Sequence, residues 1–176
     1  MLQAPQKKFL KRLLSRWIGR FNTVRRTAIY YLPLTLVALP SFADVKISNL
    51  SDFDFGQYSG SGGLFDRDNI CINVIPSSGN NYQVVITGDG SSGEFEISNG
   101  VDSLPFSVRY KDATNGEGGR KITPGEILSN QKNASDTLDC SDGLNAKIDV
   151  TFQEADLLAA QPGRYTGQLT ITISPE

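Results

Sequence analysis

The stretch Tyr165-Thr-Gly-Gln-Leu-Thr-Ile-Thr-Ile173 decides the fold class, because its apolar residues alternate with small or polar ones. Successive side chains of an extended chain point to opposite faces, so Leu169, Ile171 and Ile173 share one face with Tyr165. The same alternation occurs in seven other segments: 45–47, 53–55, 70–74, 82–86, 95–97, 104–110 and 146–152. This series of half-buried strands predicts an all-β, two-sheet sandwich.

The joints between these segments carry residues that favour tight turns. Gly and Asn adopt left-handed backbone conformations easily, and Pro fixes one backbone angle. The joints are Ser78-Gly79-Asn80-Asn81, Gly88-Asp89-Gly90, Asn99-Gly100, Asn115-Gly116 and Pro162-Gly163. Residues 154–160 are the one segment expected to form a turn of helix. We find no internal repeat, so residues 44–176 are expected to form a single domain.

Charge divides the chain near residue 43. Residues 1–43 hold eight of the seventeen Lys and Arg residues and none of the nineteen acids. The apolar run 28–40 and Ser41-Phe42-Ala43 follow the basic part, and the small residues stand where signal peptidase cleaves. The run is too short to span a membrane. We therefore expect 1–43 to be an export signal, cleaved between Ala43 and Asp44, with membrane contact only during export.

The basic part of this signal is unusually long. Apolar residues recur at helical spacing between Phe9 and Phe21, which is typical of a basic amphipathic helix on a membrane and also of a mitochondrial transit peptide. An alternative is that translation starts at Val24, read as Met in a bacterium, which would leave an export signal of ordinary length. The apolar run and its Ser-Phe-Ala end favour the secretory interpretation.

The domain at 44–176 is acidic and contains two cysteines. It holds nine basic and nineteen acidic residues, which argues against a nucleic-acid partner. In an exported chain, Cys71 and Cys140 are expected to form one disulfide bond, with two separate buried thiols as the alternative.

The residue types that most often catalyse reactions or bind metals are scarce. The chain has no histidine, the commonest general base and metal ligand. Its carboxylates occur in close pairs, but a glycosidase needs two carboxylates that face each other across a cleft. A solvated acidic surface explains these pairs better. The pairs are Asp52 with Asp54, Asp66 with Asp68, and Asp139 with Asp142.

The segment 112–117 is only loosely similar to a calcium-binding loop. Thr114 stands where an Asp or Asn ligand belongs, and the distal glutamate of such loops is missing. We therefore expect no enzyme activity, no cofactor and no metal.

Three segments together resemble the spore coat protein U family, which includes the subunits of archaic, Csu-type chaperone–usher pili. Their order and spacing carry the resemblance, which covers nearly all of 44–176. The segments are Leu50-Ser-Asp-Phe-Asp-Phe-Gly56, Cys71 followed by Ser78-Gly-Asn-Asn-Tyr82, and Pro162-Gly-Arg-Tyr-Thr-Gly-Gln-Leu-Thr-Ile-Thr-Ile173.

The resemblance implies an immunoglobulin-like sandwich that lacks its final strand, so that a groove runs beside the C-terminal strand. In this family a periplasmic chaperone lends a strand to the groove, and a neighbouring subunit replaces it in the fibre. Carried onto this chain, the groove would be lined by Tyr165, Leu169, Ile171 and Ile173. Only 174–176 follow, so no later strand is expected to cover this edge.

The implied partners are a periplasmic chaperone, an outer-membrane usher and other pilus subunits, and the implied location is the cell surface or fimbrium. Family members that polymerise carry an apolar donor extension, usually followed by a cysteine, but here only 44–49 precede Leu50. This departure fits a fibre tip or another minor, adhesive position, or a subunit that donates only Val45-Lys-Ile47. The alternative function is a self-contained secreted β-sandwich that binds a carbohydrate or another surface ligand.

Overall fold

The computed structural model describes residues 44–75 and 81–176. Within these ranges, no helix is long and apolar enough to cross a membrane. The expected export signal and Ala43 lie outside the described residues. The elements are β1 Asp44–Ser48, β2 Leu64–Ile75, β3 Tyr82–Thr87, β4 Glu96–Ser98, β5 Ser103–Pro105, β6 Ser107–Lys111, β7 Arg120–Lys121, β8 Ile127–Gln131, β9 Ala146–Phe152, the short helix α1 Glu154–Ala159 and β10 Thr170–Pro175, with a 3-10 turn at Ser91–Gly93.

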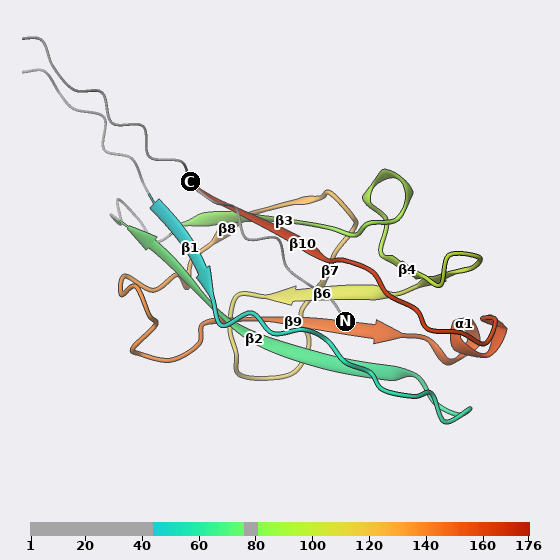
Figure 1. Cartoon of the computed structure of the whole chain (residues 1–176). Coiled ribbons are helices and arrows are strands. Elements are labelled where there is room, and N and C mark those ends of the chain that lie inside the picture. Colours follow the sequence, from blue (N-terminus) through green and yellow to red (C-terminus); the bar gives the residue numbers. More distant parts are fainter. Residues whose placement is uncertain (1–43, 76–80) are drawn as a thin grey trace, which may run out of the picture. The chain divides into compact units, whose positions relative to one another are not determined.

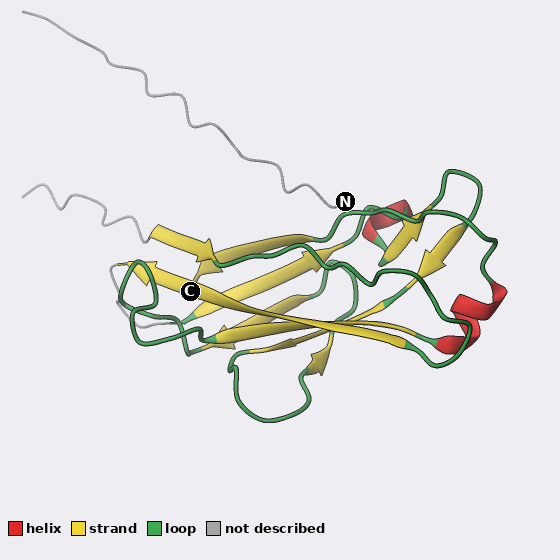
Figure 2. Cartoon of the chain, turned by 60° about the horizontal axis from the view of Figure 1, so that its bottom comes forward, coloured by secondary structure: helices red, strands yellow, loops and turns green. Residues whose placement is uncertain are grey.

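These strands form two facing antiparallel sheets and a small hairpin (Figures 1 and 2). One sheet has the order β1-β2-β9-β6-β7, the other has the order β10-β3-β8, and β4 pairs with β5. The domain is therefore an all-β, immunoglobulin-like sandwich: the alternation predicted the two sheets, and the family resemblance implied the immunoglobulin-like form.

The core lies between the inner faces of the two sheets. Alternate residues of β2, β3 and β9 point into it, because side chains of a strand alternate between its faces. The fully buried aliphatic and aromatic side chains from these strands are Ile70, Ile72, Tyr82, Val84, Ile86, Ala146 and Ile148.

A disulfide bond joins Cys71 of β2 to Cys140, in the connection between β8 and β9. Both cysteines are buried, and this bond was expected from the sequence. Asn145, next to β9, extends the sheet with its side chain: its Oδ1 accepts from the Ile72 amide at 2.9 Å, and its Nδ2 donates to the Ile72 carbonyl at 2.7 Å. The connection is thereby fixed along β2.

The predicted strands 104–110 and 53–55 differ in the structure. The run 104–110 is divided at Phe106, whose amide donates to the Phe95 carbonyl, so that β5 pairs with β4 while β6 pairs with β9. Residues 53–55 alternate but form no strand, and Phe53 and Phe55 pack against the core from an irregular segment. The turn after β3 is as predicted, and Gly88 is required there because a Cβ would overlap the Glu94 carbonyl.

Candidate strand-acceptor groove

The strand β10 lies at the edge of its sheet. Its six residues pair in antiparallel register with β3, from Thr170 opposite Thr87 to Pro175 opposite Tyr82. Its end is held further by Glu176, whose amide donates to Asn81 and whose carboxylate accepts from the Asn130 amide. Among the described residues, no strand pairs with the other side of β10. Its outward amide and carbonyl groups therefore form an open edge.

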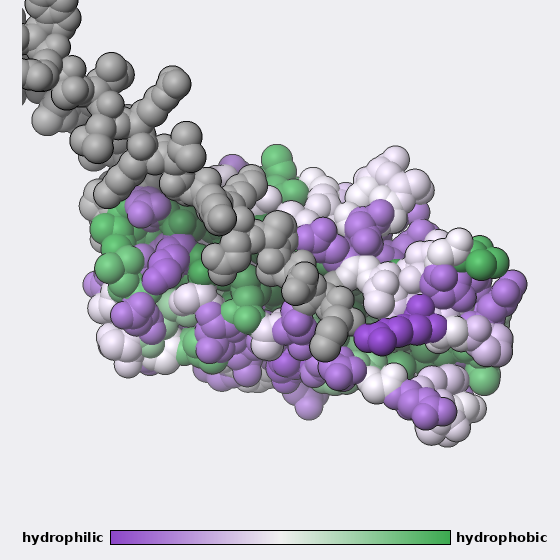
Figure 3. Space-filling view, viewed as in Figure 1, coloured by the Kyte–Doolittle hydropathy of each residue, from purple (hydrophilic) through white to green (hydrophobic). Residues whose placement is uncertain are grey.

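Apolar side chains lie along this open edge without being fully covered. Leu169, Ile171 and Ile173 pack against the core, yet each stays partly exposed. Across the gap between the two sheets, Val45 and Ile47 of β1 also pack against the core and also stay partly exposed. In Figure 3, apolar surface is visible at the end of the domain where Figure 1 shows β1. The seam between the two sheets, flanked by the edge strands β1 and β10, is thus lined by partly covered apolar side chains, and we refer to it as the groove.

Beside the segment that leads into β10 lies a cavity of about 470 Å³. Its walls are the segment 53–58 on one side and 163–167, which leads into β10, on the other. Aromatic rings provide much of the lining, and the Phe55 ring meets the Phe152 ring edge-on with centroids 4.9 Å apart. The lining side chains include Phe53, Phe55, Tyr58, Leu64, Ile97, Leu104, Phe152, Leu157 and Tyr165. An apolar side chain could be accommodated there.

The hydroxyls of Tyr58 and Tyr165 are among the polar groups of this cavity, whose lining also includes Asp54, Gln57, Arg164 and Thr166. The Tyr58 hydroxyl is buried without a hydrogen-bond partner in the part of the chain that the structure describes. Burial, and then the charge of Glu154, raise the pKa of Tyr58, so the hydroxyl stays neutral. The single hydroxyl hydrogen of Tyr165 has two acceptors within reach, the Asp102 carboxylate at 3.1 Å and the Gln161 carbonyl at 2.9 Å.

Asp102 anchors the segment before β10 to the β4–β5 hairpin. Its carboxylate accepts from the Gln161 amide and from the Tyr165 hydroxyl. These bonds, the Gln161 amide first, lower the pKa of Asp102 below its ordinary value. Ser98 and Thr166 add a pair of backbone hydrogen bonds, at 2.9 and 3.0 Å. The predicted strand 165–173 therefore begins pairing with β4, and only from Thr170 does it pair with β3.

The comparisons with known proteins bear on this fold. No protein-family model matches the chain, and no curated protein sequence is similar to it. Three chains of solved structures match. One belongs to a chaperone–tip adhesin complex described as vital for synergistic activation of CFA/I fimbriae biogenesis.

The fold is shared with a chain of that fimbrial complex. The TM-score is 0.52 at 16% sequence identity, over 76% of this chain and 42% of the other. This chain thus matches less than half of that chain's length. At such low identity the likeness shows the shared fold alone.

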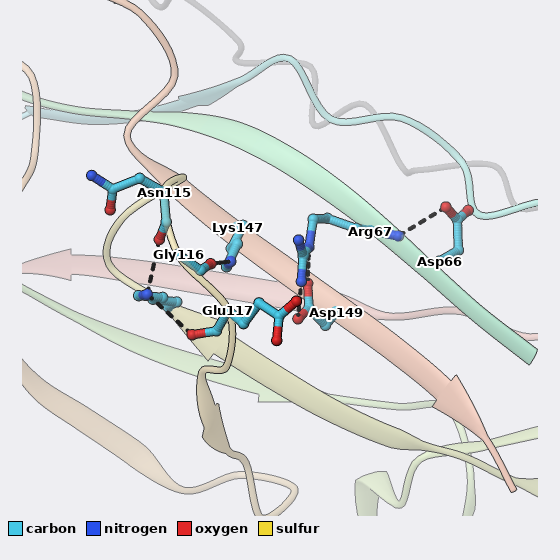
Figure 4. Close-up of polar contacts among 8 residues, drawn as sticks. Asp66, Arg67, Asn115, Gly116, Glu117, Lys147 and Asp149 are labelled. Atoms are coloured by element: carbon cyan, nitrogen blue, oxygen red, sulfur yellow. Dashed lines mark hydrogen bonds and ion pairs between the residues drawn. The ribbon is translucent and has the colours of Figure 1, made fainter.

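The outer face of the larger sheet is closed by its own polar contacts (Figure 4). Arg67 binds the buried carboxylate of Asp149 with two hydrogen bonds, at 2.6 and 2.9 Å. The loop after β6 folds over this face, where the buried Lys147 ammonium donates to the Gly116 carbonyl and Lys111 donates to the Asn115 carbonyl. These cations bind the loop backbone and so hold it on the sheet.

The acidic pairs do not converge on a site. Asp68 accepts from Ser51, Asp54 accepts from the Gly56 amide, and Asp139 lies 3.6 Å from the Lys46 ammonium. Asp112, at the start of the calcium-like segment, accepts from the amides of 132 and 133 and from the Tyr82 hydroxyl. Across 44–75 and 81–176, no three acidic or cysteine side chains are grouped as metal ligands.

The groove-lining role of Tyr165, Leu169, Ile171 and Ile173 stays a prediction, and the structure places the four residues as follows. Ile171 and Ile173 lie in β10, Leu169 lies just before it, and Tyr165 lies at the cavity. Sequence reasoning did not assign Phe53, Phe55 and Tyr58 to the groove. The alternation of 53–55 showed that one face is buried, but it could not show that this face lies opposite the segment 163–167.

Proposed function

We propose that this protein is a subunit of a bacterial surface fibre whose sandwich is completed by a strand from another protein. The open edge of β10, with partly exposed apolar side chains along it, supports this most strongly. An extended segment beside β10 would pair with its free backbone groups and place every second side chain over the groove.

The energy of the exposed side chains supports the need for such a strand. Fully burying one aliphatic side chain contributes about 1.5 to 3 kcal/mol. Leaving Leu169, Ile171 and Ile173 half covered therefore forgoes roughly 2 to 4.5 kcal/mol. This is comparable with the total stability of a small domain, which is about 5 to 15 kcal/mol. An added strand would thus supply a large part of the stability of the folded domain.

The proposed partners act one after another as the chain is exported. Residues 1–43 direct the chain through the inner membrane, and a periplasmic chaperone then covers β10. At an outer-membrane usher, a neighbouring subunit replaces the chaperone strand, and the protein becomes part of the fimbrium. The short alternation of β1, with only Val45 and Ile47 as apolar residues, offers little to donate, which fits a tip or minor subunit.

The test compares the exported protein alone with the same protein carrying a donor strand fused after Glu176. The strand should alternate valine and threonine, and its control should carry aspartate at the valine positions. We expect the valine strand to raise the unfolding temperature and to suppress aggregation, as coexpression with the chaperone should also do. The aspartate strand should do neither, because it would bury unpaired charges.

A substitution in β10 tests the same surface from the other side. Ile171→Asp should abolish capture by the chaperone, whereas Thr172→Asp, on the exposed face of β10, should not. A monomer that unfolds reversibly at high temperature, unaffected by the fused strand, would contradict the proposal. That result would favour a self-contained secreted binding module.

A further inference from the structure

The strand β1 lies close to β10 although the two share no ladder. Cα atoms of β1 and β10 approach within 8 Å, and both views of the ribbon show them side by side (Figures 1 and 2). Sheets that pack face to face are about 10 Å apart. The two edges have therefore closed toward each other at this end of the groove.

This closure places β1 where a completing strand would bring its side chains. Val45 and Ile47 pack against the same core as Ile171 and Ile173. A strand added beside β10 would lie about 4.8 Å from it and direct its apolar side chains into the space between the sheets. Because β1 already narrows that space, an added strand and β1 cannot both occupy it in the present arrangement.

The attachment of β1 would allow it to move. Five residues form a ladder with β2, on one side only. Among the described residues, β1 makes a single ion pair, between Lys46 and Asp139, whose side chains are 49% and 88% exposed, and such surface pairs contribute little.

The residues directly after β1 are held to β2 by side-chain hydrogen bonds. Asn49 adopts the left-handed conformation with φ of 62° and donates from Nδ2 to the Asn69 carbonyl at 2.9 Å. Two residues on, the amide and hydroxyl of Ser51 bind the buried carboxylate of Asp68 at 2.9 and 2.8 Å. The chain from 49 onward is therefore tied to β2 independently of β1. If β1 moves, the change of direction at Asn49 is where it would pivot.

We propose that β1 is a displaceable strap: it closes the Ile171–Ile173 end of the groove in the free domain and leaves the edge of β2 when a strand binds beside β10. This inference rests on the proposed function and describes how that same groove is regulated. Strand binding would begin at the cavity end, which β1 does not cover, and would proceed toward Ile173. The rate of completion is then limited by the fraction of molecules in which β1 is displaced.

A disulfide that locks the strap tests this directly. Asp44 and Ile75 are Cα partners in the β1–β2 register, so Asp44→Cys/Ile75→Cys should cross-link the end of β1 farthest from Asn49. The probe is a fluorescent peptide of alternating valine and threonine, long enough to span β10. We expect the oxidised variant to bind it at least tenfold more slowly than the same variant after mild reduction. The wild-type protein, treated identically, controls for reduction of the buried Cys71–Cys140 bond.

A second variant should accelerate peptide binding instead of slowing it. Val45→Ser/Ile47→Ser weakens the cover without touching β10, and should accelerate peptide association about tenfold, since 1.4 kcal/mol of lost burial is a factor of ten. Without any substitution, amide hydrogen exchange in β1 should increase when the wild-type protein binds the peptide.

The outcomes separate the two proposals. Equal association rates for the locked and reduced variants, with unchanged exchange in β1, would overturn the strap while leaving strand binding intact. Failure of every variant and of the wild-type protein to bind the peptide would overturn both the strap and the proposed function.

Discussion

Removal of the Cys71–Cys140 bond by Cys71→Ala/Cys140→Ala should destabilise the domain by an amount that follows from the loop it closes. The two residues are 69 positions apart. In the chain-entropy description, a cross-link over about 70 residues lowers the entropy of the unfolded chain enough to stabilise the fold by about 4.4 kcal/mol at 25 °C. Alanine is the suitable replacement, because both sites are buried and a serine hydroxyl would need a partner.

This free energy corresponds to a large shift of the unfolding temperature. A domain of about 130 residues has an unfolding entropy near 270 cal/mol/K, so the midpoint should fall by about 16 °C. Circular dichroism on heating measures the shift, and urea titration should also show a steeper dependence, because the unfolded chain without the cross-link exposes more surface.

Reduced wild-type protein is the matched control, since it lacks the cross-link but keeps both sulfur atoms. It should unfold at nearly the same midpoint as the double alanine variant. A loss below about 1 kcal/mol in both samples would refute the reasoning. It would mean that the segment between the cysteines is already restrained in the unfolded ensemble.

Four further predictions concern other parts of the chain. The intact mass of the exported protein should show cleavage between Ala43 and Asp44, and a larger mass would contradict the export signal. As the pH falls below about 4 toward the lowered pKa of Asp102, hydrogen exchange should increase in the segment that leads into β10, because this carboxylate stabilises the fold only while charged; Asp102→Asn should show the loosened state at every pH. Above about pH 10, the free energy of unfolding should fall as pH rises, because burial raises the pKa of Tyr110 and the unfolded state ionises first; Tyr110→Phe should reduce that slope, and an unchanged slope would count against this cause. Gly88→Ala should cost about 1 to 3 kcal/mol in a denaturant titration, because its Cβ would overlap a backbone carbonyl, and a wild-type midpoint would show that the turn adjusts freely.

The strands with clean alternation could be predicted from sequence, because burial on one face imposes a period of two. Tyr82, Val84 and Ile86 of β3 illustrate this, since each is fully buried and each intervening residue is not. The start of β2 could not be predicted, because Asp66 and Asp68 occupy positions in phase with its buried isoleucines. Only the structure shows Ser51 satisfying Asp68 and so making a buried carboxylate acceptable.

The strand β8 could not be predicted from the sequence either, because its residues do not alternate. Ile127 is exposed and Leu128 is buried, and the remaining residues are polar, so the segment lacks an apolar alternation. It becomes a strand because β3 offers it an edge for backbone pairing. The cavity could not be predicted either, since 53–58 and 163–167 are brought together only by the fold.

The position of the disulfide also determines how far the domain can be stretched. A force applied at Asp44 and at Glu176 passes through the bond between Cys71 and Cys140, so the residues between the cysteines carry no tension. At about 3.4 Å per extended residue, this removes roughly 230 Å from the length that an unfolded subunit could release. With the bond reduced, single-molecule pulling should release about twice the length seen for the oxidised protein.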